Sequence, residues 1–132
     1  MRVLLIFLFT ASLVFAQRGN TGDKTFSHRF PPDVENKVSG SFLEIANTVE
    51  HDIIVLIRDQ YKKYIRHAYI RANESYTFGN LPITRIYVQF KSLEFYFEDR
   101  KVQVINFNEK RKFMFFYDAS QKGNYFEISE EE

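Results

Sequence analysis

The sequence predicts an all-β fold, an antiparallel β-sandwich of about eight strands. Short segments rich in β-branched and aromatic residues recur along the chain, and many of them alternate between polar and apolar positions. Gly, Pro, Asn and Asp separate these segments at intervals of roughly 8 to 12 residues. No segment has the apolar spacing of a convincing amphipathic helix. A sandwich is favoured over a small barrel because several strands are apolar on one face only.

The first residues have the pattern of a secretory signal peptide. The basic Arg2 precedes an apolar run that ends at Phe15, and Ala16 supplies the small residue before the predicted cut. The run is shorter than the roughly 20 residues of a membrane-spanning helix, and the sequence has no cysteine that could carry a lipid. We therefore expect cleavage of residues 1–16, a secreted or periplasmic protein, and no transmembrane segment.

Composition predicts one small domain held by its core alone. The chain has 132 residues and no cysteine, so no disulfide can crosslink it. Its 15 Phe and 8 Tyr supply core material, since each aromatic ring buries a large area. The 18 basic residues include Arg2, so the chain from Gln17 onward carries as many basic as acidic residues. This balance gives no sign of nucleic-acid binding.

The chain after the signal peptide divides into a lead-in and a domain. Residues 17–40 contain isolated apolar residues and frequent breakers such as Pro31-Pro32, so we expect a flexible, mostly unstructured lead-in with an edge strand as the alternative. The β-sandwich domain is predicted over residues 41–130. Its candidate strands are residues 41–47, 52–58, 64–72, 75–78, 85–90, 93–98, 101–107, 112–117 and 125–128.

The segment 52–90 is the predicted centre of the domain. The run from Ile53 to Ile57 is apolar on both faces and rich in β-branched residues, which is typical of a central strand. The polar segment 59–63 then predicts a hairpin connection to the strand over 64–72. In that strand the alternation places Ile65, His67 and Tyr69 on one face and Arg66, Ala68 and Ile70 on the other. A polar loop is predicted over residues 119–123.

The segment IANTVEHDIIVLIRDQYKKYIRHAYIRANESYTFGNLPITRIYVQF resembles small exported bacterial β-sandwich proteins of the transthyretin-like, carboxypeptidase-regulatory-like type. The shared order is a strand ending in Asn, an IIVLI strand, an IRHAYI strand, a polar turn, a short strand, and NLP leading to YVQF. The segment departs from such modules in two places: no Gly lies between Pro82 and Tyr87, and no Trp follows Lys91. The resemblance implies a transthyretin-like or Ig-like sandwich and an accessory or interaction module, with no catalytic residues.

Four residues are candidates for surface binding: Tyr64, Arg66, Tyr87 and Tyr96. The strand neighbours of the three tyrosines include charged or amide residues, which predicts that the rings are exposed. Exposed aromatic rings stack on sugars or anchor protein partners. The competing interpretation assigns the rings to the core, which a small chain without disulfides needs.

Other patterns carry weaker chemical signals. Glu50-His51-Asp52 with His67 or His28 has ligand atoms for a metal, but the spacing is irregular, so we expect no metal and no cofactor. Two clusters of basic residues are candidate binding sites for acidic glycans or phosphates, but the favoured interpretation is that they form a solvated rim. The clusters are Arg58, Lys62, Lys63, Arg66 and Arg71, and Lys110-Arg111-Lys112. Asn73-Glu74-Ser75 is a glycosylation sequon and predicts an exposed turn.

These observations favour an exported, non-catalytic module that binds an envelope or extracellular protein. A carbohydrate-binding module with a surface glycan as partner is the alternative. A hydrolase is the least favoured class, because the sequence has no G-x-S-x-G, no cysteine and no Gly-rich phosphate loop. A hydrolase would require a cleft that gathers ionisable side chains.

Overall fold

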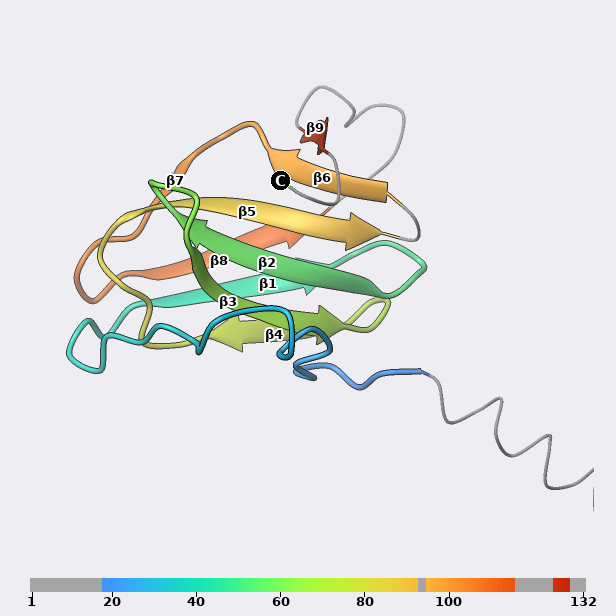
Figure 1. Ribbon diagram of the computed structural model, residues 1–132, viewed down its shortest axis with the longest axis horizontal. Helices are drawn as coiled ribbons and strands as arrows, with labels where there is room; N and C mark the ends of the chain where they lie inside the picture. The colour runs from blue at the N-terminus through green and yellow to red at the C-terminus, as the bar shows by residue number, and fades with distance from the viewer. Residues whose placement is uncertain (1–17, 93–94, 116–124, 129–132) are drawn as a thin grey trace, which may run out of the picture.

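The computed structural model describes residues 18–92, 95–115 and 125–128, which form two β-sheets packed face to face (Figure 1). The strands are β1 (Phe42–Asn47), β2 (Ile53–Asp59), β3 (Tyr64–Ile70), β4 (Ser75–Phe78), β5 (Arg85–Ser92), β6 (Phe95–Asp99), β7 (Gln103–Val104), β8 (Lys110–Phe115) and β9 (Tyr125–Ile128). No helix occurs among the described residues. The all-β prediction is therefore confirmed, and the two sheets are consistent with a sandwich.

The two sheets differ in size and in strand direction. The smaller sheet has the order β4-β1-β8, and the larger has the order β3-β2-β5-β6-β9, with β7 also paired to β5. Strands β1 and β8 run parallel, with Phe42 opposite Lys110 and Asn47 opposite Phe115. The prediction of a wholly antiparallel sandwich is wrong at this pair. The chain crosses from β7 to β8 at the end of the molecule where β1 also begins, so both strands start from the same end.

Strand β2 shows how the core is built. Ile53, Val55 and Ile57 are buried between the sheets, whereas Ile54 and Leu56 lie half-buried on the outer face of the larger sheet. Burial of an aliphatic side chain contributes roughly 1.5–3 kcal/mol, so the inner row is the main support of this strand. The outer row has a different role, because no second sheet covers it.

Aromatic rings join the two sheets across the core. Phe90 of β5 stacks on Phe115 of β8, with the ring centroids 4.3 Å apart and the planes at 22°. Phe113 stacks on the same Phe90 ring at 5.7 Å. These contacts support the prediction that packed aromatic rings stabilise this small domain, which has no disulfides.

The segment predicted as a lead-in runs along the outer edge of β3. It contains turns and no strand in its described part, residues 18–40. Its backbone bonds to both ends of β3: Gly22 N donates to Tyr69 O at 2.8 Å, Tyr69 N donates to Asp23 O at 2.9 Å, and Val34 N donates to Ile65 O at 2.9 Å. These bonds satisfy backbone groups that an edge strand would otherwise present to other chains.

The strand predicted over residues 101–107 is wrong in length, since β7 has only two residues. The neighbouring residues instead form turns: Lys101 N donates to the Asp99 carboxylate, and Glu109 N donates to Asn106 O. The predicted signal peptide and the polar loop over 119–123 lie outside the described residues. Among the residues that the structure describes, no helix is long and apolar enough to cross a membrane.

Candidate binding groove on the larger sheet

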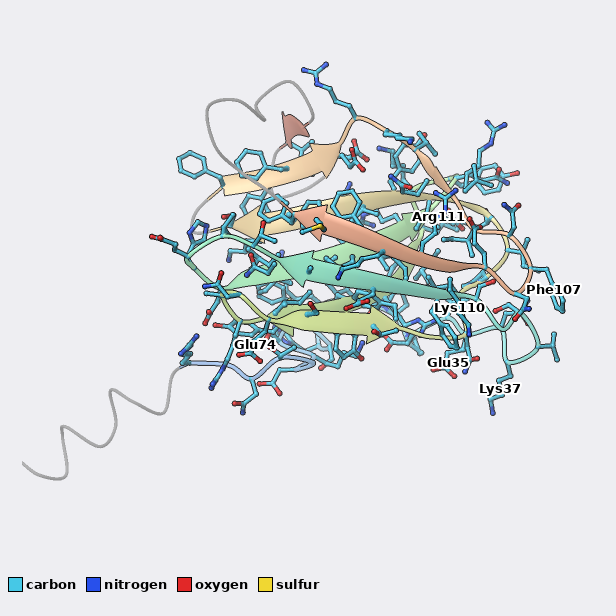
Figure 2. The ribbon with its side chains drawn as sticks, turned by 180° about the vertical axis from the view of Figure 1, so that it is seen from behind. Glu35, Lys37, Glu74, Phe107, Lys110 and Arg111 are labelled. Carbon is cyan, nitrogen blue, oxygen red and sulfur yellow. The ribbon has the colours of Figure 1, made fainter. Side chains whose placement is uncertain are left out.

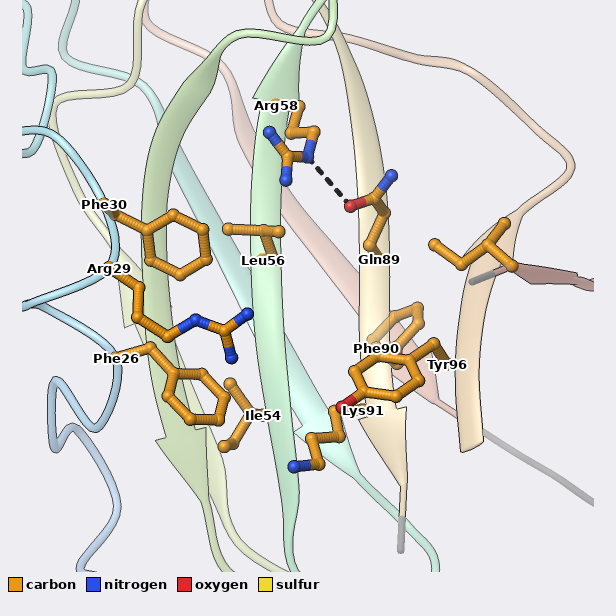
Figure 3. Close-up of a pocket in the computed structure, with 11 residues that line it drawn as sticks. Phe26, Arg29, Phe30, Ile54, Leu56, Arg58, Gln89, Phe90, Lys91 and Tyr96 are labelled. Atoms are coloured by element: carbon orange, nitrogen blue, oxygen red, sulfur yellow. Dashed lines mark hydrogen bonds between the residues drawn. The ribbon is translucent and has the colours of Figure 1, made fainter. Parts of the chain in front are cut away.

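A groove lies on the outer face of the larger sheet (Figure 3). Its floor is formed by Ile54 and Leu56 of β2 and by the flanking side chains of β5. One wall comes from Phe26, Arg29 and Phe30 of the lead-in, and the opposite wall comes from Tyr96 of β6 and Ile128 of β9; Arg58, Gln89, Phe90 and Lys91 complete the lining. The enclosed volume is about 80 Å³.

The floor follows from the β2 sequence. Because side chains alternate along a strand, the apolar run of β2 sends Ile54 and Leu56 outward when its other residues face the core. Covering an apolar outer row stabilises it by removing apolar area from water, and Phe26 and Phe30 lie beside this row. The groove is therefore the part of this apolar row that the lead-in leaves open.

Buried and half-buried hydrogen bonds hold the lead-in wall in place. Phe26 N donates to Nε2 of His67 at 3.1 Å, and Nδ1 of His67 lies 2.7 Å from the Tyr64 hydroxyl, which donates to the Asp33 carboxylate. Since Nε2 accepts, the imidazole is neutral and carries its proton on Nδ1. Burial, with Lys24 nearby, lowers the pKa of His67 and keeps this form. The Phe30 ring stacks on Tyr64 at 4.6 Å.

Cationic side chains surround the apolar floor. Arg58 Nε donates to Gln89 Oε1 at 3.0 Å, and burial lowers the pKa of this guanidinium. Lys91 Nζ lies 5.2 Å from the centre of the Phe26 ring and 5.5 Å from that of Tyr96, within cation–π range. No carboxylate occurs among the described residues that line the groove. The groove therefore combines apolar surface with positive charge.

Tyr64 and Arg66 do not lie on the surface as predicted. Tyr64 is only 7% exposed and Arg66 only 6% exposed, so the prediction of an exposed Tyr64 is wrong. The lead-in covers Tyr64 by stacking Phe30 on its ring, whereas Arg66 points to the inner face of the sheet, and Glu35 Oε1 lies 4.0 Å from one of its nitrogens. Arg66 shares the inner face with Ala68, and its Nε and Nη2 have no hydrogen-bond partner.

The other two candidates lie on the outer face of the larger sheet. Tyr87 is half-buried beneath Lys62, whose Nζ lies 3.8 Å from the ring centre. Tyr96 is half-buried and lines the groove. The structure thus brings one of the four predicted residues, Tyr96, into the candidate site. The prediction misses Phe26 and Phe30, which lie in the segment expected to be a flexible lead-in. The sequence signal for them is the apolar outer row of β2, which favours a segment that covers it.

A second pocket gathers ionisable side chains at the far end of β2. His51, Asp52, Tyr69 and Lys91 line it. The Asp52 carboxylate accepts from Arg18 Nε at 2.9 Å and from Ala72 N at 2.9 Å, and it also accepts from the Tyr69 hydroxyl. These partners hold the pKa of Asp52 far below its usual range. The carboxylate is therefore ionised at neutral pH, and it joins the lead-in, β3 and the turn after β3.

This second pocket lacks the geometry of a catalytic triad. The His51 ring nitrogen Nε2 contacts the Ser92 hydroxyl, but Ser92 is buried and does not line the pocket. In the described part of the chain, no hydrogen bond joins His51 to Asp52. The candidate metal ligands Glu50, His51 and Asp52 are not joined by His67, whose ring hydrogen-bonds with Tyr64. Among the described residues, no group of three or more possible metal ligands lies close together.

No protein-family model, no curated protein and no solved structure matches this chain. The fold and the groove define a class: a two-sheet β protein with a small cationic groove on the larger sheet. The resemblance to transthyretin-like modules stays a prediction.

Proposed function

We propose that the protein is an exported, non-catalytic binding module whose groove holds an acidic, apolar segment of an envelope or extracellular protein. The observation that carries this proposal is the groove lining: apolar residues from β2 and the lead-in, cations beside them, and no carboxylate among the described lining residues. A bound segment with alternating acidic and apolar side chains complements both properties.

The size of the groove favours a peptide over a small-molecule ligand. Sites for drug-sized ligands and cofactors have volumes of roughly 300–1,000 Å³, whereas this groove encloses about 80 Å³. Such a volume accommodates one or two side chains of a longer partner. The remaining contacts of that partner would lie along the exposed outer face of the larger sheet.

The carbohydrate alternative has weaker support from the same residues. Sugar stacking uses an open aromatic face beside hydrogen-bond acceptors. One face of Phe30 is covered by Tyr64, and Lys91 and Arg29 lie over the Phe26 ring. The lining offers one side-chain amide, Gln89, and cations that only donate.

The test uses a fluorescent peptide that alternates Glu with Leu and Phe, and a matched peptide with Gln in place of Glu. The chain from Gln17 should bind the acidic peptide more tightly. Leu56→Glu should abolish binding, because it places a like charge on the floor, and Lys91→Gln should weaken it about tenfold. Lys112→Gln, an exposed change on β8, is the matched control.

Equal affinity for the acidic and neutral peptides would overturn the proposal. Binding to a glycan array that is lost in Leu56→Glu would favour the carbohydrate alternative. A variant with Gln at 130–132 removes the three glutamates that follow β9 in the sequence, so it tests whether the chain's own acidic residues compete with the peptide. Capture from an envelope fraction, with Leu56→Glu as the paired bait, would identify the partner.

A further inference from the structure

Four loops meet at one end of the molecule, which we call the basic end: residues 35–40, 60–63, 79–85 and 105–110 (Figure 1). Strand pairing places them together, because the end of β2 and the start of β5 are paired at Asp59 and Ile86. Backbone bonds also tie the loops: Asn36 N donates to Asn80 O at 2.8 Å, and Ile105 N donates to Thr84 O at 2.9 Å.

Large apolar side chains are exposed at the basic end. Val38 is 79% exposed, Tyr61 74%, Phe107 69% and Ile83 50%. Loop tips normally carry polar residues, and isolated exposed apolar residues are unremarkable. Here four of them occupy the tips of four adjacent loops, which is a concentration that the rest of the described surface does not show.

Hydrogen bonds hold the two turns that present Val38 and Phe107. Val38 lies in a turn in which Ser39 N donates to Asn36 O at 3.1 Å. Phe107 lies in a turn in which Asn106 N donates to the Glu109 carboxylate at 2.8 Å. Asn108 N joins the two turns by donating to Ser39 O at 2.6 Å. Val38 and Phe107 therefore project from hydrogen-bonded turns, which lowers the conformational entropy that docking would cost.

Positive charge is concentrated at the same end. The exposed cations of the four loops include Lys37, Lys62, Lys63, Arg85 and Lys110, of which Lys62 is paired with Glu98 of β6. The acidic residues of these loops are Glu35 and Glu109, and each has a cation nearby: Arg66 at 4.0 Å and Arg111 at 2.6 Å. Figure 2 shows Lys37, Phe107, Lys110 and Glu35 at this end and Glu74 at the other.

We propose that the basic end docks on an anionic lipid surface. Phe107, Val38 and Ile83 enter the headgroup region, and the surrounding lysines and arginines contact the anionic headgroups. Apolar side chains combined with cations are what interfacial membrane binding requires. The surface is made of separate projecting tips, whereas protein hot spots lie in packed, flat or concave patches. This proposal does not depend on the groove, which lies on a sheet face and stays accessible.

The absence of Trp from the sequence makes insertion directly measurable. Phe107→Trp places a single tryptophan at the basic end, and Phe95→Trp places one at the start of β6, at the opposite end. We use the chain from Gln17, because every core residue lies at or after Leu43. Vesicles of phosphatidylcholine with phosphatidylglycerol should blue-shift the emission of Phe107→Trp and leave that of Phe95→Trp unchanged.

Vesicle co-sedimentation tests the charges. Changing Lys37, Arg85 and Lys110 together to Gln should lower binding at least tenfold, and so should high salt or pure phosphatidylcholine vesicles. Phe107→Ala should weaken binding severalfold without changing the melting temperature, because the side chain is exposed. Lys112→Gln on the face of the smaller sheet is the control and should bind normally.

Four results would overturn the proposal. The first is no emission shift for Phe107→Trp with anionic vesicles, and the second is an equal shift for Phe95→Trp. The third is binding to heparin without binding to vesicles, which would assign the basic end to an anionic polysaccharide. Unaltered vesicle binding by Phe107→Ala together with full salt sensitivity would likewise contradict insertion.

Discussion

At the scale of single residues, the protonation state of the His67 side chain controls a hydrogen bond that holds the groove wall. Its Nε2 accepts the Phe26 N–H, so the imidazole must be neutral for this bond to exist. Burial lowers the pKa of His67 from the ordinary value of 6.5, so the native state resists protonation while the unfolded chain accepts it. This residue therefore contributes stability that is fully present above pH 6.5 and is lost as pH falls through its native pKa.

We expect the wild-type protein to lose stability between pH 7 and pH 5, and the variant His67→Gln to lose less over that interval. Urea denaturation at each pH measures both. Parallel pH profiles for the two proteins would contradict a neutral native His67.

The Asp52 carboxylate joins the lead-in to β3 and to the turn that follows it. Asp52→Asn removes the charge that Arg18, the Tyr69 hydroxyl and the Ala72 amide share. We expect a loss of about 1–3 kcal/mol in unfolding free energy at pH 7. The pKa of Asp52 is lowered, so this contribution is present above pH 3.8 and fades in stronger acid. Urea curves at pH 7 and pH 3 should show the difference shrinking.

At the scale of elements, β2 depends on its inner row. Val55 has no solvent exposure and lies between the sheets. Val55→Asp buries a charge without a partner, so we expect folding to be abolished. Leu56→Ala, one residue away on the outer face, is the control and should keep a cooperative transition. A cooperative melt of Val55→Asp at the wild-type midpoint would refute the central position of β2.

Two turns of the basic end are locked through Gly40. Its φ of +62° lies in the left-handed region, and a Cβ there would lie 3.0 Å from the Asn108 side-chain oxygen. We expect Gly40→Ala to destabilise the protein by about 1 kcal/mol or more. Gly79→Ala is the matched control, because a Cβ there meets only Phe42 at an ordinary 3.5 Å and the φ is not left-handed. Thermal melts should show a lower midpoint for Gly40→Ala alone.

At the scale of the whole molecule, the lead-in is part of the folded unit. Removal of residues 17–30 would uncover the β3 edge near Tyr69 and delete the Phe26 and Phe30 wall. We expect the shortened chain to self-associate through the exposed edge and to lose acidic-peptide binding. Size-exclusion chromatography and the peptide assay measure the two effects. A monomer with full peptide affinity would show that the lead-in contributes to neither.

The distribution of charge is another property of the whole molecule. The chain from Gln17 has no formal net charge, and this balance gives no sign of nucleic-acid binding. Folding gathers cations from four separate loops at one end, while the exposed Glu50 and Glu74 lie on loops at the other. A net charge of zero therefore coexists with an uneven distribution of charge between the two ends of the molecule.

The sequence by itself determined the β class, most strand positions and the central β2, because these depend on alternation and turn residues within a few positions of each other. Tertiary structure alone decided the parallel β1–β8 pair, the burial of Tyr64 and Arg66, the groove and the basic end. Each of these depends on which distant segments become neighbours. Local pattern does not encode that choice, because many pairings of the same strands bury similar apolar area.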